Sequence, residues 1–414
     1  MASESWKLQT WCNLPVYTGD VSGVCSALYE LGGMVVMHDP SGCNSTYNTH
    51  DEIRWTSMES LIFLSGLTQL DAITGNDKKL IDDITAAAKE FHPAFIAIAN
   101  SPVPWLIGTD FEAICRQVSA QTGISTFHVE TNAMHDYTRG AGQAFLKLAK
   151  MLFPEDAACS RVKDTGNPER HRIRVNVLGM TPLDFAHRCD AENLRDMLEK
   201  AGFETVSVWA VGDTLDHLRR AAQADVNLVV SSVGIDAARY MEETLGIPYT
   251  AGIPVGAFSK VLFEQMEKCA RTRVSCAAYL EILERHRDVQ EAVSIHNGSD
   301  SPGRTEETRA DLNRCIAGEP VTMGSIAADL ILRDRKDCDL IPLTETVKGL
   351  IPGDAVRPEG ERQIRDVLGR YREVIADPML RAACSQGCRF REQPHFALSG
   401  RMYLEHILPL ITKE

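Results

Sequence analysis

Two cysteines near the start of the chain have the residue type and the placement for metal binding. Cys25 lies in a segment with helical character, and Cys43 follows Gly42 in the loop after an apolar run at residues 35–37. A continuous apolar run between glycine and proline is typical of a buried parallel strand. Proteins of the α/β class place their sites in the loops at the carboxyl ends of such strands. Because thiolates bind zinc and iron–sulfur clusters, the pattern predicts a metal or cluster site here.

The other cysteines carry less chemical information. The chain has 12 cysteines but no Cys-x-x-Cys pair, and the shortest spacing is Cys384 to Cys388. On a helix these two thiols would share a face and could hold a metal, although Gly387 weakens that helix. A third early cysteine, Cys12, precedes the first predicted helix. The rest are expected to be packing or surface thiols: Cys115, Cys159, Cys189, Cys269, Cys276, Cys315 and Cys338.

The composition is that of a globular protein with more than one core. The chain has 414 residues, of which 44% are hydrophobic and 24% charged, so two or three α/β domains are expected. Its net charge of −14 argues against nucleic acid, which needs a basic surface. Residues 1–10 lack the apolar core of a signal peptide, and no apolar run approaches the roughly 18 residues of a membrane span. We therefore expect a cytoplasmic protein with no membrane and no nucleic-acid partner.

Strands and helices alternate along the chain, which predicts parallel sheets flanked by helices. Strands are expected at residues 34–38, 95–99, 127–129, 173–178, 206–210 and 226–231. Helices are expected at residues 21–31, 75–91, 111–120, 137–152, 190–202, 214–224, 234–245 and 257–290. The prolines at 102 and 104 favour a turn over a helix after the second strand.

Polar, turn-rich segments divide the chain. Residues 154–169 separate the first run of elements from the second, and residues 297–303 are expected to form a surface loop before a third run that begins near residue 319. We predict an N-terminal α/β domain with the ligand loop at 1–160, a middle α/β domain at 161–300 and a C-terminal α/β domain at 301–414.

Several motifs, taken together, resemble the nitrogenase component 1 type oxidoreductases. The resemblance rests first on the segments at 22–28 (SGVCSAL), 38–43 (HDPSGC) and 75–80 (GNDKKL). Later landmarks occur in the same order at 107–110 (IGTD) and 245–249 (LGIPY). The segment at 394–401 (PHFALSGR) is similar to the closing strand of the family, and an amphipathic terminal helix is expected after it.

This resemblance implies three Rossmann-like domains and an iron–sulfur cluster of the 4Fe–4S or 8Fe–7S type at a subunit interface. Cys43 matches a family ligand, and either Cys25 or Cys12 would be the other. The loop at 100–104 has no cysteine at the place of a third ligand. Since a 4Fe–4S cluster takes four thiolates as a rule, two per chain require a second chain. The partner would be a paralogous component 1 subunit in a heterotetramer or a second copy in a homodimer, with an ATP-dependent iron protein as electron donor.

One departure from the family concerns the catalytic cofactor. In nitrogenase a cysteine after a middle-domain strand holds that cofactor, and the matching residue here is Ser231. Serine is a poor ligand for a soft iron–sulfur cofactor. The catalytic centre is therefore expected in a partner chain, although a role for His395 or for another cysteine stays open.

Other residues have both a functional and a structural interpretation. His38 and Asp39 could tune a cluster through hydrogen bonds to sulfur, or His38 could simply cap its strand. The polar and aromatic run at 48–55 could line a cluster edge or a substrate channel, or pack as an ordinary loop. In the family, residues placed like His395 and Arg401 can face a central cavity between domains.

Three functional hypotheses follow. The first is a subunit of a nitrogenase-like two-component reductase, with the β-like subunit of a methylthio-alkane reductase as its specific form. The second is a non-catalytic scaffold that assembles a nitrogenase-type cofactor. The third is a homodimeric tetrapyrrole reductase of the same family. The sequence identifies neither the substrate nor the cluster nuclearity.

Overall fold

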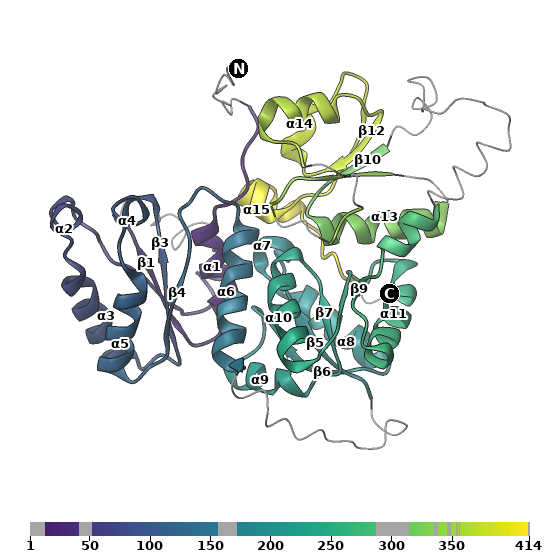
Figure 1. The fold of residues 1–414 in the computed structure, drawn as a ribbon. Coiled ribbons are helices and arrows are strands. Elements are labelled where there is room, and N and C mark those ends of the chain that lie inside the picture. Colours follow the sequence, from purple (N-terminus) through teal and green to yellow (C-terminus); the bar gives the residue numbers. More distant parts are fainter. Residues whose placement is uncertain are drawn as a thin grey trace, which may run out of the picture.

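The computed structural model describes residues 13–40, 52–155, 172–286, 314–334, 338–345, 349–352, 355 and 357–412. Three parallel sheets, each flanked by helices, are grouped round a shared centre (Figure 1). We call the parts built on them the first, middle and last domains. The predicted α/β class with three Rossmann-like domains is confirmed. No described helix has the length and apolar character needed to cross a membrane.

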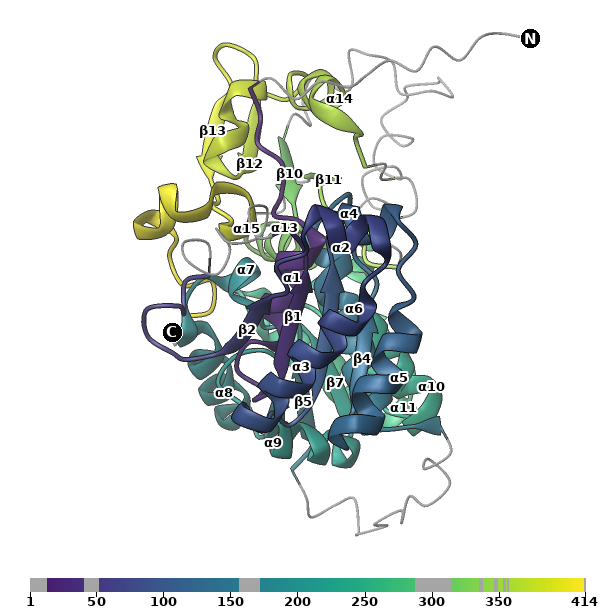
Figure 2. The same ribbon diagram turned by 90° about the vertical axis from the view of Figure 1, so that its left-hand side faces the viewer.

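The first sheet has the strand order β2-β1-β3-β4. Its strands are β1 (Met34–His38), β2 (Leu61–Leu64), β3 (Ile96–Asn100) and β4 (Thr126–Val129). Side chains alternate across the sheet, as the two-residue period of a strand requires. Val35 and Met37 join the core under α1 (Asp20–Leu28) and α6 (Tyr137–Leu152). Met34 and Val36 pack under α3 (Asp77–Phe91) and α5 (Phe111–Thr122), which cover the outer face (Figure 2).

The middle sheet has the order β6-β5-β7-β8-β9. Its strands are β5 (Arg174–Leu178), β6 (Glu204–Val208), β7 (Val226–Val229), β8 (Tyr249–Ala251) and β9 (Cys276–Ala277). Its helices are α7 (Pro182–Phe185), α8 (Arg188–Lys200), α9 (Leu215–Arg219), η3 (Arg220–Gln223), η4 (Ser232–Gly234), α10 (Ile235–Leu245) and α11 (Phe258–Thr272).

The last sheet has the order β11-β10-β12-β13. Its strands are β10 (Arg314–Gly318), β11 (Asp339–Pro342), β12 (Glu373–Ala376) and β13 (Arg389–Glu392). Its helices are α13 (Pro320–Asp334), α14 (Gly360–Leu368), η6 (Pro378–Ala383), α15 (Phe396–Ser399) and η7 (Gly400–His406).

Three expectations about the elements were wrong. The single helix expected at 257–290 is interrupted: α11 ends at Thr272, because Arg273 adopts a left-handed conformation with φ of 58° and the chain turns into β9. Helical structure resumes at residues 280–286. The segment at 394–401 is not a closing strand but short helices, and residues 407–412 are not helical. The prolines after β3 begin a short helix, α4 (Pro102–Leu106), since proline is compatible with the first helical turn.

Several other predictions were incomplete. The structure adds β2 and α2 (Gln69–Thr74) to the first domain, and β8 and β9 to the middle one. The expected loop at 297–303 and most of the boundary at 154–169 lie outside the described residues.

Glycines allow α1 and α6 to touch through their backbones. A Cβ at Gly140 of α6 would lie 1.9 Å from the carbonyl oxygen of Asp20, and a Cβ at Gly23 of α1 would lie 2.3 Å from that of Tyr137. The carboxylate of Asp20 also accepts hydrogen bonds from the backbone N–H groups of Asn132 and Ala133 at 3.0 and 2.9 Å. Both views place the two helices side by side next to the centre of the molecule (Figures 1 and 2). This contact fixes α6, and with it the side chains that α6 directs to that centre.

Candidate functional site

Segments that follow strands of all three sheets meet in one interior region. α7 follows β5 and carries Asp184, while Glu319 follows β10 directly and Asp377 follows β12 directly. His395 begins α15 after the last strand, and Tyr137 begins α6 after β4. Ligands of α/β proteins bind at such strand ends. This region is therefore the first candidate for function.

Asp184 joins the three domains at this point. Its carboxylate accepts hydrogen bonds from the Tyr137 hydroxyl and from Thr181 Oγ1, each at 2.6 Å. His395 Nε2 lies 3.5 Å from the Asp184 carboxylate and 3.5 Å from the Tyr137 oxygen. The side chains of Asp184 and His395 are 1% and 10% exposed. We call Tyr137, Thr181, Asp184 and His395 the Asp184 cluster.

The environment of the Asp184 cluster favours a retained proton. Burial by itself lowers the pKa of His395, but the hydrogen bond to Asp184 and the charges of nearby carboxylates raise it above its ordinary value. Burial raises the pKa of the Tyr137 hydroxyl well above its ordinary value, and the charge of Asp184 adds to this effect. His395 Nδ1 has no hydrogen-bond partner among the described residues. The cluster can therefore hold a proton between an imidazole and a carboxylate away from water.

Glu319 adds a second buried carboxyl to this region. Its two oxygens accept hydrogen bonds from the backbone N–H groups of Ser232 and Thr322, both at 2.8 Å. Burial raises the pKa of Glu319, and the negative charge of Asp184 raises it further. The Tyr17 ring packs against the rings of Tyr137 and His395, with centroids 6.1 and 5.6 Å apart. The chain's own side chains thus occupy the region where the strand ends meet.

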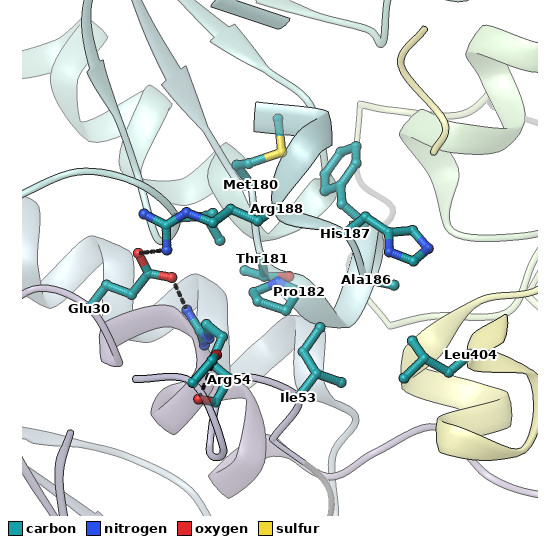
Figure 3. Close-up of a pocket in the computed structure, with 13 residues that line it drawn as sticks. Glu30, Ile53, Arg54, Met180, Thr181, Pro182, Ala186, His187, Arg188 and Leu404 are labelled. Atoms are coloured by element: carbon teal, nitrogen blue, oxygen red, sulfur yellow. Dashed lines mark hydrogen bonds and ion pairs between the residues drawn. The ribbon is translucent and has the colours of Figure 1, made fainter. Parts of the chain in front are cut away.

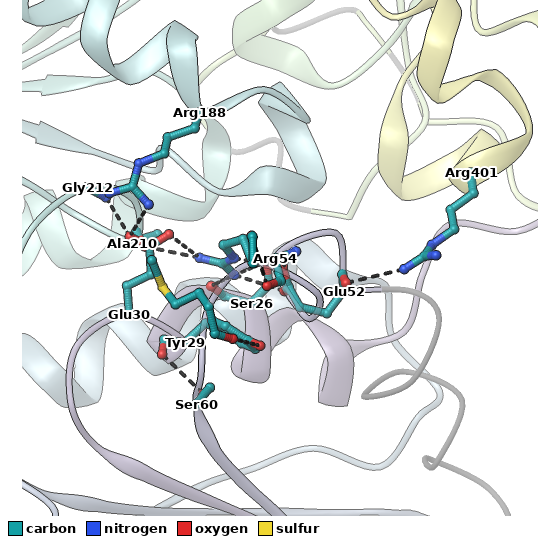
Figure 4. Close-up of polar contacts among 12 residues, drawn as sticks. Ser26, Tyr29, Glu30, Glu52, Arg54, Ser60, Arg188, Ala210, Gly212 and Arg401 are labelled. Atoms are coloured by element: carbon teal, nitrogen blue, oxygen red, sulfur yellow. Dashed lines mark hydrogen bonds and ion pairs between the residues drawn. The ribbon is translucent and has the colours of Figure 1, made fainter.

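A network round Arg54 joins the first domain to the middle one (Figure 4). The guanidinium contacts Glu30 at 3.1 Å and Glu52 at 2.7 Å, and these carboxylate side chains are only 4% and 2% exposed. It also donates to the carbonyl oxygen of Ala210 at 3.3 Å and lies 4.4 Å from the centre of the Tyr29 ring. Glu30 in turn contacts Arg188 at 3.3 Å. Arg54 is thus paired with two buried carboxylates of its own domain, and its bond to Ala210 and the Glu30–Arg188 pair reach the middle domain.

A pocket of about 290 Å³ lies beside this network and reaches all three domains (Figure 3). The first domain supplies Glu30, Ile53, Arg54 and Ser57, and η7 of the last domain supplies Leu404. The middle domain supplies most of the wall, at residues 180–182, 185–188 and 211. Thr181 belongs to both the pocket wall and the Asp184 cluster. The pocket is small for an organic ligand, since such sites usually measure about 300–1,000 Å³.

Two of the three predicted cluster ligands, Cys12 and Cys43, lie outside the described residues. Cys25 lies in α1, is 0% exposed and belongs to the apolar core. Burial raises the pKa of its thiol, which disfavours the thiolate that iron requires. Among the described residues no group of three or more His, Cys, Asp or Glu side chains is arranged to hold a metal ion. The Cys25 site by itself does not fit a cluster, and ligation by Cys12, Cys25 or Cys43 stays a prediction.

The structure gives Ser231 a structural role. It follows β7, is 0% exposed, and its hydroxyl accepts a hydrogen bond from the Val233 N–H at 3.4 Å at the start of η4. A Cβ at Gly179 would lie 2.9 Å from the Ser231 carbonyl oxygen. The backbone on both sides of Ser231 is therefore tightly packed.

The remaining candidates are placed as follows. His38 Nδ1 lies 2.8 Å from Ser65 Oγ, and burial lowers the pKa of His38 to about 4. Asp39 is 1% exposed, and its carboxylate oxygens have no partner within the described ranges. Arg401 donates to the carbonyl oxygen of Glu52 at 3.5 Å. Cys384 and Cys388 flank a turn that contains Gly387, so they do not share a helical face, although the two thiols lie close enough to interact.

Sequence reasoning identified His395 but missed its partners. Asp184, Glu319 and Asp377 all come directly after, or one short turn after, a strand of their sheet. Glu319 and Asp377 were missed because the strands before them, β10 and β12, were not predicted, and Asp184 lies in a short helix after the predicted strand at 173–178. Arg54 was included only as part of the run at 48–55, of which residues 52–55 are described.

The fold and the shared centre at the strand ends define a three-domain α/β protein. Residues 23–294 match the model of the nitrogenase component 1 type oxidoreductases. The chain belongs to this family. The predicted resemblance is confirmed.

Individual relatives are distant and match over part of their length. The nitrogenase iron-molybdenum cofactor biosynthesis protein NifE of Methanosarcina barkeri is 25% identical over 52% of this chain and 46% of its own. The nitrogenase molybdenum-iron protein alpha chain of Clostridium pasteurianum is 28% identical over 52% of this chain and 39% of its own. A subunit of the light-independent protochlorophyllide reductase of Zygnema circumcarinatum is 24% identical over 44% and 35%. The matched stretches thus span less than half of these relatives.

A solved structure supports the fold over a longer stretch. The structure titled "Nitrogenase Cp1 at pH 5" covers 86% of this chain and 70% of its own, with a TM-score of 0.51 and 19% identity. At this identity the likeness concerns the arrangement of the domains alone.

Proposed function

We propose that this chain is a subunit of a nitrogenase-like two-component reductase whose catalytic centre lies in a paralogous partner chain. Electrons would come from an ATP-dependent iron protein. An iron–sulfur cluster shared with the partner would accept and donate single electrons, with Cys43 and either Cys12 or Cys25 as this chain's ligands. Family membership supports the oxidoreductase class.

The packing round Ser231 is the observation that carries the proposal. A catalytic cofactor held within this chain would need both a soft ligand and open space where the strand ends meet. Instead Ser231 is buried and caps η4, and the Asp184 cluster and Glu319 occupy the adjoining space. These features favour a supporting subunit over one that carries the catalytic cofactor.

A second candidate is a scaffold that assembles a cofactor for a nitrogenase-like enzyme. The matches to proteins named NifE favour it, since their names describe cofactor biosynthesis. A homodimeric tetrapyrrole reductase is the third alternative, and the matches to protochlorophyllide reductase subunits favour it. Methylthio-alkanes are one substrate class to test for the two-component reductase.

The test is the content of iron and acid-labile sulfide per chain after anaerobic purification, alone and with the co-expressed paralogous subunit. The proposal expects the cluster only in the complex, together with ATP-dependent reduction of a substrate when iron protein is added. About two irons per chain in this protein alone would instead indicate one 4Fe–4S cluster per homodimer. A complex that contains iron and sulfide but reduces no substrate would favour the scaffold. The absence of iron from both preparations would exclude a cluster.

Single substitutions identify the cluster ligands, with the iron content of the same complex as the measurement. Cys43→Ser should lower the iron content of the complex, whereas Cys189→Ser, at a half-buried thiol on α8, is the matched control and should leave it unchanged. Cys12→Ser and Cys25→Ser then decide which thiol is the other ligand. Ser231→Ala should leave the iron content unchanged, because the hydroxyl caps η4 in this proposal.

A further inference from the structure

Two free thiols of the middle domain lie in direct contact. Cys269 Sγ and Cys276 Sγ are 3.4 Å apart. Cys269 lies in the last turn of α11, and Cys276 is the first residue of β9. Cys269 is 2% exposed, and Cys276 is partly exposed. Cys276 is thus the more exposed residue of the pair, and Cys269 is the buried one.

The chain between the two thiols is short and fixed at both ends. Arg273 ends α11 with its N–H bound to the Cys269 carbonyl oxygen at 2.9 Å. Ser275 Oγ accepts a hydrogen bond from the Tyr249 N–H at 2.9 Å, and Thr250 pairs with Cys276 in the sheet. The thiol–thiol contact is therefore part of the folded connection between α11 and β9.

The surroundings of the pair promote ionisation of one thiol. The S–H of Cys276 donates to Cys269 and lowers the pKa of Cys269 to about 7, while burial opposes this effect. The charge of Lys268 also favours the thiolate, and the charge of Glu242 disfavours it. The same contact raises the pKa of Cys276, and Glu281 adds to that rise. The pair shares one proton near neutral pH, which is the state in which thiols react.

We propose that Cys269 and Cys276 form a redox-active dithiol that closes to a disulfide when the protein meets hydrogen peroxide. The shared proton moves to Cys269 Sγ, and the thiolate of Cys276, the more exposed residue, attacks one peroxide oxygen. The O–O bond breaks, and hydroxide leaves and takes a proton to become water. The sulfenic acid formed is then attacked by the second sulfur, the S–O bond breaks, and a second water leaves. Two thiols are oxidised to one disulfide while one peroxide is reduced to two waters. The sulfurs approach from 3.4 Å to about 2 Å, so only small movements are required.

The disulfide would fix a helix that also contacts the last domain. Just before α11, the N–H of Ala257 donates to Asp329 of α13 at 2.8 Å. The N–H of Ile253 donates to Ser325 Oγ of the same helix at 2.9 Å. A disulfide at the C-terminal end of α11 would therefore restrict the movement of this helix, whose N-terminal end contacts the last domain. This modification is independent of the proposed function, because it uses none of the predicted ligands.

The test treats the reduced full-length protein with one equivalent of hydrogen peroxide at pH 7, followed by alkylation and peptide mapping. We expect a cross-link between positions 269 and 276, a loss of two hydrogens from the intact mass, and reversal by dithiothreitol. The pair should be oxidised at least about tenfold faster than Cys115, a lone buried thiol whose pKa is raised to about 12.

Variants distinguish formation of the disulfide from other effects of oxidation on the protein. Cys276→Ser should abolish the cross-link, and Cys189→Ser is the matched control that should retain it. Oxidation should raise the Tm of the wild-type protein by about 2 °C or more and leave that of Cys276→Ser unchanged. The proposal is overturned if Cys115 reacts as fast as the pair, or if both thiols oxidise without forming the cross-link.

Discussion

The hydroxyl of Tyr137, at the first residue of α6, donates to the carboxylate of Asp184 in α7 at 2.6 Å. One hydrogen bond therefore joins the first and middle domains at a point to which the last domain adds His395. The same Asp184 carboxylate also accepts from Thr181, which lines the pocket.

Removing the Tyr137 hydroxyl should weaken the interface between the first and middle domains. Tyr137→Phe keeps the buried ring but leaves a charged acceptor without one of its donors, so the free energy of unfolding should fall by about 2 kcal/mol. Urea unfolding measures the change. Tyr371→Phe is the matched control, because its hydroxyl bonds Asp339 at the surface, and it should change stability by less than about 0.5 kcal/mol. Equal losses in the two variants would contradict a special role for Tyr137.

Arg54 should be required for stability. Arg54→Met leaves Glu30 and Glu52 buried without their shared cation, and breaking such a pair costs about 3–5 kcal/mol. The measurement is the urea midpoint at constant m-value. Lys78→Met serves as control, since its ion pair with Asp82 is exposed and should contribute less than about 1 kcal/mol. A loss below about 1 kcal/mol for Arg54→Met would show that the network does not hold the domains together.

The contact between α1 and α6 should not tolerate a single added methyl group. In Gly140→Ala the new Cβ would lie 1.9 Å from the Asp20 carbonyl oxygen, so the helices must separate, at a cost of about 3 kcal/mol. Gly142→Ala on the same helix meets only ordinary contacts, 3.5 Å from the Val233 carbonyl oxygen. Its higher helix propensity should make it neutral or stabilising by up to about 1 kcal/mol. Thermal unfolding of both variants tests the difference, and similar Tm values would refute the close approach.

Asp190 should make stability depend on pH. Burial raises the pKa of this carboxyl from 3.8 to about 6 in the folded protein. Because the folded protein binds the proton more tightly than the unfolded chain, the carboxyl stabilises the fold fully below pH 3.8. That stabilisation is lost as the pH rises to about 6.

Asp190→Asn tests this dependence. The variant keeps an acceptor for the Ile411 N–H, which bonds Asp190 Oδ1 at 2.7 Å, but it does not titrate. The wild-type stability relative to Asp190→Asn should therefore fall between about pH 4 and about pH 6. Urea unfolding across this range measures it, with the surface variant Asp216→Asn as control. A difference that is constant with pH would show that Asp190 is not responsible.

The sequence was informative wherever a local pattern determines the structure. The apolar residues of β1 and β3 indicated buried parallel strands because both faces of those strands are covered. The end of α11 was missed because Arg273 carries no glycine-like signal for its left-handed conformation. The short strands β8 and β9 were missed because two or three residues show no measurable period.

The site depends on long-range packing, which a single sequence does not encode locally. His395 was named as a residue facing the centre, yet nothing near it in the sequence pointed to Asp184 or Tyr137 as its neighbours. The Cys269–Cys276 contact was likewise hidden, because on the helix expected at 257–290 the two thiols would share a face but lie two turns, about 10.5 Å, apart. The predicted ligands Cys12 and Cys43 lie outside the described residues, so the cluster hypothesis depends on experiment.

The Asp184 cluster draws one side chain from the last domain and one from the first to an acid of the middle domain. Any rotation of one domain against the others must therefore change how tightly the cluster holds its proton. A partner that reorients the domains on docking would release or take up protons in step with binding. Calorimetry of complex formation in buffers of different ionisation enthalpy would measure the number of protons taken up or released, and that number would report the domain movement.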